Sequence, residues 1–377
     1  MGREKILLIM SFPGIVIPLT YAIYFHQSFL NNSIDENLLY NSFINSLLIT
    51  TPIFIILVLL LYFFSILIGG PLLYLFFSFM GYLVNLFNSS IIIIIIQKIF
   101  NIYLGHNLKV FLYYVIAILI SIYGHIRAEL IYFDKYEIKV EHWKNEKEGL
   151  KVKIAHLSDL HLCPIYGRKL VEKIITKLNN EVGISFIVLT GDIVDGDIFD
   201  NKINLSILEP FKKSRYKIYY VTGNHEEFTD KIRLFYLLEK VGITLLDNKI
   251  ETLSKYKINL IGIGYDKNYK KVKNETIPEL CEISNENNYI NVVLCHIPFF
   301  KPKHLVRYNI FLFLCGHTHG AQMIPTNIYI WSKNTVLNGL YSYLNKYYVY
   351  CVSGVGNSGP PLRTFARANI GLITLTK

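Results

Sequence analysis

The feature that most constrains the fold is a long stretch without any charge. From Asn37 to Gln97 the chain contains no Asp, Glu, Lys, Arg or His. A helix crosses the hydrocarbon core of a bilayer with about 20 apolar residues, whereas buried helices of soluble proteins rarely run this long without a charge. The first part of the chain is therefore predicted to lie in a membrane.

Four segments of this part are predicted to be transmembrane helices, namely Ile6–Leu30, Asn45–Ile68, Pro71–Phe87 and Val110–Ile126. The isoleucine run at 91–96 could extend the third segment, although Asn88, Ser89 and Ser90 interrupt it. A cleaved signal peptide would explain only the first segment, and no small-residue cleavage site follows it. We expect a multi-span transmembrane region over residues 1–132.

The basic residues that flank these segments predict an orientation in the cell membrane. Arg3 and Lys5 precede the first segment, and Arg127 and Lys135 follow the last one. The positive-inside rule places such residues on the cytoplasmic side. With four spans the rest of the chain is therefore cytoplasmic, and with three spans it would face outward. The five cysteines form no disulfide framework, which agrees with a reducing compartment.

The second part, residues 133–377, has the pattern of an α/β domain. Short apolar runs that mostly end in polar clusters are KIAHL, SFIVLT, KIYYVT, INLIGIG, NVVLCH, IFLFLC and YYVYCVS. Helical patterns such as Lys169–Asn180 lie between the early runs, so strands and helices alternate around a buried sheet. The alternation of Tyr136–Trp143, followed by the polar turn Asn145–Gly149, predicts a hairpin at the start of the domain.

Polar side chains follow five of these predicted strands. They stand in Ser158-Asp159-Leu160-His161, Gly191-Asp192, Gly223-Asn224-His225-Glu226, His296 and Gly316-His317-Thr318-His319. In α/β sheets, chemistry gathers where strands end, and borderline divalent metals accept mixed nitrogen and oxygen ligands. Two metals about 3.5–4 Å apart can clamp a phosphoryl group and activate a water molecule. Asp192 lies midway in the series, so it is the natural candidate for a carboxylate that bridges two ions.

Taken together, the five motifs resemble those of the calcineurin-like metallophosphoesterases. The resemblance covers roughly residues 136–377 and implies two packed mixed β-sheets flanked by helices. It implies two divalent ions, with Asp159, His161 and His319 on the first, Asn224, His296 and His317 on the second, and Asp192 between them. It also implies that His225 is a catalytic histidine, which stabilises the transferring phosphoryl group or protonates the leaving oxygen. Ligands of this kind suit Mn, Fe, Zn or Ni.

The end of the chain narrows the resemblance. The segment Val352–Phe365 is similar to the closing segment of a bacterial subgroup of membrane-associated phosphohydrolases. Some members of that subgroup cleave the pyrophosphate of nucleotide-linked acylated glucosamine. Arg363 could then contact a substrate phosphate, since its planar fork suits phosphate oxygens. A surface or structural salt bridge is the alternative role of this arginine. Many relatives have glycine where this chain has Ala321, which matters if the loop needs a positive φ there.

Three residues beside the motifs are predicted to have structural roles. His156 lies on a predicted strand just before Asp159, so we expect it to be packed or hydrogen-bonded in the core. Asp195 is predicted to form a turn rather than to bind a metal. Glu226 is predicted to order either His225 or the loop around it.

These observations predict a membrane-anchored dinuclear phosphoesterase that hydrolyses a phosphodiester or pyrophosphate bond with a metal-activated water. A lipid-linked phosphate ester is one candidate substrate, and the bilayer is a partner. A nuclease or nucleotide phosphodiesterase of the same superfamily is a first alternative, since the net charge is +10. No aromatic-interleaved basic stretch supports it, so no stable nucleic-acid partner is expected. An inactive sensor or scaffold is a second alternative. An inactive domain would be expected to lose metal ligands, whereas every ligand position is filled in this chain.

Overall fold

The computed structural model describes residues 70–141, 143, 151–163, 167–195, 205–268, 275–285, 289–299, 302–325, 330, 332 and 336–377. They belong to two compact units. The first unit ends at Arg127 and also includes the short segments Ile324–Thr326 and Gly359–Thr364; the second contains the remaining residues from Ala128 onward. The predicted boundary between residues 132 and 133 stays a prediction. Each unit is described by itself.

In its described residues the first unit contains two long helices, α4 (Gly70–Phe100) and α5 (His106–Glu129, whose last two residues belong to the second unit). The predicted interruption of the third span at Asn88, Ser89 and Ser90 is wrong, because α4 runs through these residues without a break. The hydroxyl of Ser89 donates to the carbonyl of Leu86 at 2.7 Å, and that of Ser90 donates to the carbonyl of Phe87 at 2.8 Å. Both hydroxyls thus have an acceptor in α4 itself, and the hydroxyl of Ser89 also reaches the carbonyl of Tyr113 on α5 at 2.9 Å.

Both helices have the length and composition of membrane spans. The stretches Phe77–Phe100 and Phe111–Glu129 are long and apolar enough to cross a bilayer. Large apolar side chains are exposed along them, including Leu75, Phe79, Ile95, Ile99, Phe111, Leu119, Ile122 and Ile126. Monomeric soluble proteins rarely expose apolar surface on this scale. The predicted segments Ile6–Leu30 and Asn45–Ile68 lie outside the described residues, so the four-span prediction stays a prediction.

The second unit is built on two six-stranded sheets. The first sheet has the order β1 (Tyr132–Lys139), β12 (Asn369–Thr376), β2 (Lys151–Leu157), β3 (Ile184–Thr190), β4 (Ile218–Val221) and β5 (Ile243–Leu245). Strands β2 to β5 are parallel to one another. The predicted hairpin between β1 and β2 is wrong, because β12 lies between them, parallel to β1 and antiparallel to β2. β12 is buried on both faces and suits an interior position, whereas β1 has exposed residues and lies at the edge.

The second sheet has the order β10 (Gly339–Tyr343), β11 (Tyr347–Cys351), β9 (Ile310–Cys315), β8 (Ile290–Cys295), β7 (Ile258–Ile263) and β6 (Lys249–Leu253). Strands β11, β9, β8 and β7 are parallel, and an antiparallel strand closes each edge. Both sheets are therefore mixed, as the resemblance implied.

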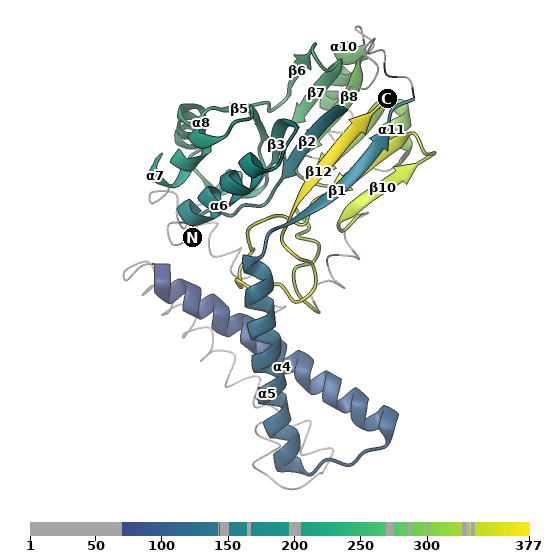
Figure 1. Cartoon of the computed structure of the whole chain (residues 1–377). Helices are drawn as coiled ribbons and strands as arrows, with labels where there is room; N and C mark the ends of the chain where they lie inside the picture. Colours follow the sequence, from purple (N-terminus) through teal and green to yellow (C-terminus); the bar gives the residue numbers. More distant parts are fainter. Residues whose placement is uncertain are drawn as a thin grey trace. The chain divides into compact units, whose positions relative to one another are not determined.

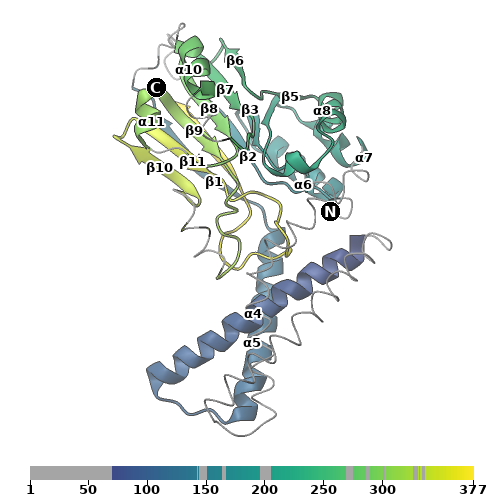
Figure 2. The same ribbon diagram turned by 180° about the vertical axis from the view of Figure 1, so that it is seen from behind.

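The core of this unit lies between the two sheets. One buried cluster joins Ile154, Phe186 and Tyr219 of the first sheet to Leu260, Leu312 and Tyr350 of the second. A second cluster packs α10 (Ile277–Asn285) and α11 (Pro302–Arg307) on the second sheet. Helices α6 (Gly167–Asn180), α7 (Leu205–Leu208) and α8 (Lys231–Lys240) lie on the β3–β5 side of the first sheet (Figures 1 and 2). The α/β fold with two mixed sheets is thus confirmed.

Candidate metal centre

The predicted site residues follow the ends of parallel strands in both sheets. Asp159 follows β2, Asp192 follows β3, Asn224 follows β4, His296 follows β8 and His317 follows β9. Main-chain hydrogen bonds tie the loops after β2 and β3 together, from the N–H of Asp159 to the carbonyl of Gly191 at 3.1 Å and from His161 to Asp192 at 3.0 Å. The parallel arrangement therefore gathers these polar side chains at one edge of the fold.

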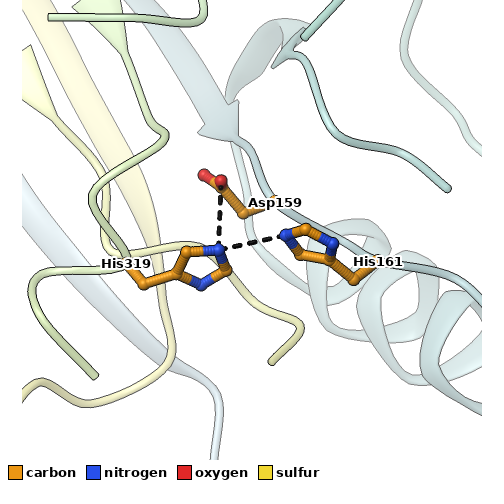
Figure 3. Close-up of side chains that lie close together, drawn as sticks. All are labelled: Asp159, His161 and His319. Atoms are coloured by element: carbon orange, nitrogen blue, oxygen red, sulfur yellow. Dashed lines mark hydrogen bonds and ion pairs between the residues drawn. The ribbon is translucent and has the colours of Figure 1, made fainter. Parts of the chain in front are cut away.

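A first group consists of Asp159, His161 and His319 (Figure 3). The Nε2 atoms of the two histidines are 3.0 Å apart, and Nε2 of His319 is 3.4 Å from Oδ1 of Asp159. All three residues are buried. Two ring nitrogens that face one another beside a carboxylate can share a cation, and this donor set suits a borderline divalent metal.

A second group consists of Asp192, His296 and His317. Nε2 of His296 is 3.1 Å from Oδ2 of Asp192 and 3.2 Å from Nδ1 of His317. The amide oxygen of Asn224 lies 3.0 Å from the same nitrogen of His296. The second group therefore offers two imidazoles, a carboxylate and an amide oxygen to a metal ion.

Asp192 lies between the two groups. Its Oδ2 is 3.8 Å from Nε2 of His161 in the first group and 3.1 Å from Nε2 of His296 in the second. The structure thus brings together all seven residues that the sequence predicted as metal ligands, and the His/Asp groups among them are consistent with a binuclear site. The bridging role of Asp192 stays a prediction. The assignment of each residue to one ion stays a prediction.

His225 and Asp195 extend the site. His225 begins a short 3-10 helix, His225–Phe228, and its Nε2 lies 3.9 Å from Oδ2 of Asp192. Oδ1 of Asp195 is 2.9 Å from Nδ1 of His161 and 3.3 Å from Nδ1 of His225, although the second pair is not aligned as a hydrogen bond. The prediction that Asp195 forms a turn rather than binds a metal did not include this contact with His161. The place of Asp195 three residues after Asp192 was the one signal in the sequence.

Glu226 orders the loop after β3 rather than His225. Its side chain is fully buried. The carboxylate accepts hydrogen bonds from the main-chain N–H groups of Asp192 at 3.0 Å, Ile193 at 2.7 Å and Gly223 at 2.6 Å. Gly223 must also lack a side chain, because a Cβ there would clash with the carboxylate of Asp192. Glu226 thus fixes the backbone that carries Asp192.

The charges of the site shift the pKa values of its histidines in opposite directions. Burial disfavours the charged ring of His225, but the charge of Asp192 and the nearby carboxylate of Asp195 raise its pKa to about 10. Burial likewise disfavours the charged ring of His296, but the charge of Asp192 outweighs burial and raises the pKa of His296 to about 9. Burial and the neighbouring His296 lower the pKa of His317 to about 3. The buried carboxylates therefore demand positive charge, which protons or metal ions can supply.

The loops that carry the ligands have an uncommon backbone conformation. Positive φ angles occur at Asp159 (53°), His161 (45°), Asp192 (52°), His317 (71°) and His319 (51°). Ala321 also has a φ of 58°. For residues other than glycine this region costs roughly 1–2 kcal/mol, and such strain clusters at functional sites.

Arg363, the predicted substrate-binding residue, belongs to the first unit. Its side chain is fully buried, and its main-chain N–H donates to the carbonyl of Gly124 at 2.9 Å. Its proposed contact with a substrate phosphate stays a prediction.

Comparisons with known proteins agree with this geometry. Residues 152–321 match the sequence profile of the family described as calcineurin-like phosphoesterase. An uncharacterized metallophosphoesterase of Helicobacter pylori is 29% identical over 234 residues, which cover 61% of each chain. One of Campylobacter jejuni is 31% identical over 239 residues, 61% of this chain and 60% of its own. A transmembrane protein with metallophosphoesterase domain from Danio rerio is 29% identical over 284 residues, 69% of this chain and 61% of its own. The chain thus spans about three fifths of the length of these relatives.

Proposed function

We propose that this chain, whose second unit carries a calcineurin-like metallophosphoesterase domain, is a phosphohydrolase that cleaves a phosphodiester or pyrophosphate bond with two divalent metal ions. The observation that carries the proposal is the position of Asp192. One of its oxygens lies 3.8 Å from a nitrogen of the first group and 3.1 Å from a nitrogen of the second. A carboxylate placed in this way fits the space between two ions.

The residues of the chain have separate roles in this reaction. Asp159, His161 and His319 would hold one ion, Asn224, His296 and His317 the other, and Asp192 both. The ions, when bound, polarise the phosphoryl oxygens and lower the pKa of a water molecule. His225 lies 3.9 Å from Asp192, and the carboxylates beside it favour the protonated form of its ring. It would give that proton to the leaving oxygen as a general acid.

The first unit supports a membrane location for the enzyme. Helices α4 and α5 are long and apolar enough to span a bilayer, and one relative is named as a transmembrane protein. We propose a multi-pass anchor of four helices with the phosphoesterase domain on the cytoplasmic side. An ester at the membrane surface, such as a lipid-linked phosphate or pyrophosphate, would then be the substrate. The donor set admits Mn, Fe, Zn or Ni.

Hydrolysis by the purified full-length protein in detergent tests this function. The substrate is bis(4-nitrophenyl) phosphate, with and without Mn²⁺, and the variants are Asp192→Asn and His225→Ala. Glu172→Gln is the matched control, because this exposed side chain on α6 changes charge away from the site. We expect Mn²⁺-dependent turnover that falls at least 100-fold in both site variants and is kept in the control. A wild-type protein that binds no Mn²⁺, or unchanged turnover in Asp192→Asn, contradicts the proposal.

A further inference from the structure

Two short segments from the C-terminal part of the chain belong to the first, helical unit. Ile324–Thr326 and Gly359–Thr364 group with α4 and α5 rather than with the sheets. The first loop follows the ligand His319 along the chain, and the second follows Gly354 and Gly356. The helical unit is therefore joined by the chain itself, at two places, to the loops of the candidate metal centre.

Within the helical unit, the side chain of Leu362 packs against two glycines, one in α4 and one in α5. Leu362 is fully buried. Any side chain at Gly81 of α4 would clash with Leu362 and would lie 3.1 Å from Cβ of Pro360. A Cβ at Gly124 of α5 would lie 3.2 Å from Cβ of Leu362 and 3.2 Å from Cγ2 of Thr364. Glycine inside a helix lowers stability by roughly 0.5–1 kcal/mol relative to alanine. The close approach of Leu362 explains why both positions are nevertheless glycine.

Hydrogen bonds hold the same two loops within the helical unit. The main-chain N–H of Arg363 donates to the carbonyl of Gly124 at 2.9 Å. The side-chain amide of Asn88 donates to the carbonyl of Ile324 at 2.8 Å. The N–H of Ile324 donates to the hydroxyl of Thr364 at 3.3 Å, which ties one loop to the other.

Within the phosphoesterase unit, Gln322 joins the ends of the same loops. Its side-chain oxygen accepts a hydrogen bond from the N–H of Ser358 at 3.1 Å, and its carbonyl accepts one from Phe365 at 3.1 Å. Gln322 is buried and stands three residues after His319. It therefore holds together the points at which both loops leave this unit.

The second loop contacts a predicted metal ligand directly before it leaves. The N–H of Gly356 donates to the carbonyl of Asp159 at 2.9 Å, and that of Val355 donates to the carbonyl of Ser158 at 3.3 Å. A Cβ at Gly354 would lie only 2.7 Å from Cβ of Asp159. A shift of this loop must therefore move the backbone of Asp159.

We propose that α4 and α5 position the metal centre and do not serve only as an anchor. Leu362, held between Gly81 and Gly124, fixes both loops, and their other ends hold Asp159 and the segment from His317 to Gln322. The helical unit then acts as a positioning element of the enzyme. This inference rests on the proposed function for the identity of the centre that is positioned.

A size swap in the full-length protein in detergent tests the inference. The variants are Gly81→Leu, Leu362→Ala and the two together, with Gly105→Leu as the matched control because a Cβ there meets nothing within 4 Å. Calorimetry gives the affinity for Mn²⁺, and hydrolysis of bis(4-nitrophenyl) phosphate gives kcat/KM. We expect at least tenfold weaker Mn²⁺ binding and lower kcat/KM in Gly81→Leu, recovery to within threefold in the double variant, and wild-type values in the control.

Amide hydrogen exchange without metal gives a second readout. We expect faster exchange over residues 317–323 and 353–358 in Gly81→Leu and in Leu362→Ala. Wild-type exchange and wild-type Mn²⁺ affinity in both single variants would overturn the inference, and Leu362→Ala alone decides it if Gly81→Leu does not fold. A wild-type protein that binds Mn²⁺ but cleaves no ester contradicts the proposed function only, since the affinities still decide this inference. If it binds no metal, the exchange rates decide it.

Discussion

Oδ1 of Asp195 lies 2.9 Å from Nδ1 of His161. The other ring nitrogen of His161, Nε2, faces His319. The same carboxylate is held ionised. Burial disfavours its charge, but its hydrogen bond to His161 and the nearby ring of His225 outweigh burial and lower its pKa to about 2. A carboxylate on the far nitrogen of a ligating histidine fixes the ring orientation and raises its basicity as a ligand. We therefore expect Asp195 to position His161, a predicted metal ligand, without binding the metal itself.

Replacement of Asp195 by asparagine should weaken metal binding while the fold is kept. Loss of such a partner lowers metal affinity by about 10–100-fold, so Asp195→Asn should bind Mn²⁺ that much more weakly than the wild type. Calorimetric titration measures the change, and Asp266→Asn is the control because it removes the same charge from an exposed loop residue. Equal affinity in Asp195→Asn and wild type would show that His161 needs no such partner.

The affinity of the centre for metal should rise with pH between 6 and 8. The pKa of His296 is about 9, because the charge of Asp192 outweighs burial, so the ring carries a proton throughout this range. A ligating imidazole must be neutral, and the metal therefore displaces this proton when it binds. The pKa of His317 is about 3, so that ring releases none. One displaced proton predicts about tenfold tighter Mn²⁺ binding per pH unit.

Calorimetry in buffers of different ionisation enthalpy counts the protons released at each pH. The expected count at pH 7 includes one proton from His296. An affinity that stays constant between pH 6 and pH 8 would mean that the ring is already neutral before metal binds.

A glycine at position 321 should stabilise the loop that carries His317 and His319. Ala321 has a φ of 58°, a conformation that costs roughly 1–2 kcal/mol for a residue with a Cβ. Glycine adopts it freely but loses more backbone entropy on folding, by roughly 0.5–1 kcal/mol. Ala321→Gly should therefore raise the free energy of unfolding by about 0.5–1 kcal/mol.

Thermal unfolding of Ala321→Gly beside Ala155→Gly measures this effect. Ala155 lies in β2 and has no positive φ, so glycine there should lower stability by about 1 kcal/mol. If both variants lose stability equally, the loop does not store strain at Ala321.

The strands and the residues at their ends could be predicted because that information is local. Runs such as IFLFLC contain the strand, and the residue that follows each run is placed at the sheet edge by the parallel pairing. The partner of β1 could not be predicted, because β12 comes from the far end of the chain. The continuity of α4 was missed for a different reason. Whether Ser89 breaks or joins a helix depends on the carbonyl that its hydroxyl reaches, here that of Leu86.

The roles of Asp195 and Glu226 depend on contacts between segments. Asp195 matters because its carboxylate meets His161, which is 34 residues away in sequence. Glu226 is likewise joined to the main chain of Ile193, 33 residues earlier. A single sequence shows Asp195 as an acidic residue beside Gly196, a pattern equally typical of turns, and Glu226 as one of two adjacent glutamates. The seven predicted ligands were easier, since their residue types are suited to metals wherever they meet.

His156 should make the second unit lose stability as the pH falls below 6.5. Its ring is fully buried, Nε2 lies 2.8 Å from the hydroxyl of Thr190, and burial lowers its pKa from 6.5 to about 3. The unfolded chain therefore binds a proton near pH 6.5, while the folded chain does not until about pH 3. Stability that is present above pH 6.5 is then lost as the pH falls, by about 2 kcal/mol at pH 5.

His156→Gln keeps a hydrogen-bonding group beside Thr190 but cannot titrate. Urea unfolding followed by the fluorescence of Trp143, buried in the core between the sheets, measures both proteins at pH 7 and pH 5. The wild type should lose about 2 kcal/mol more than the variant between these pH values, and equal losses would mean that His156 accepts its proton in the folded protein.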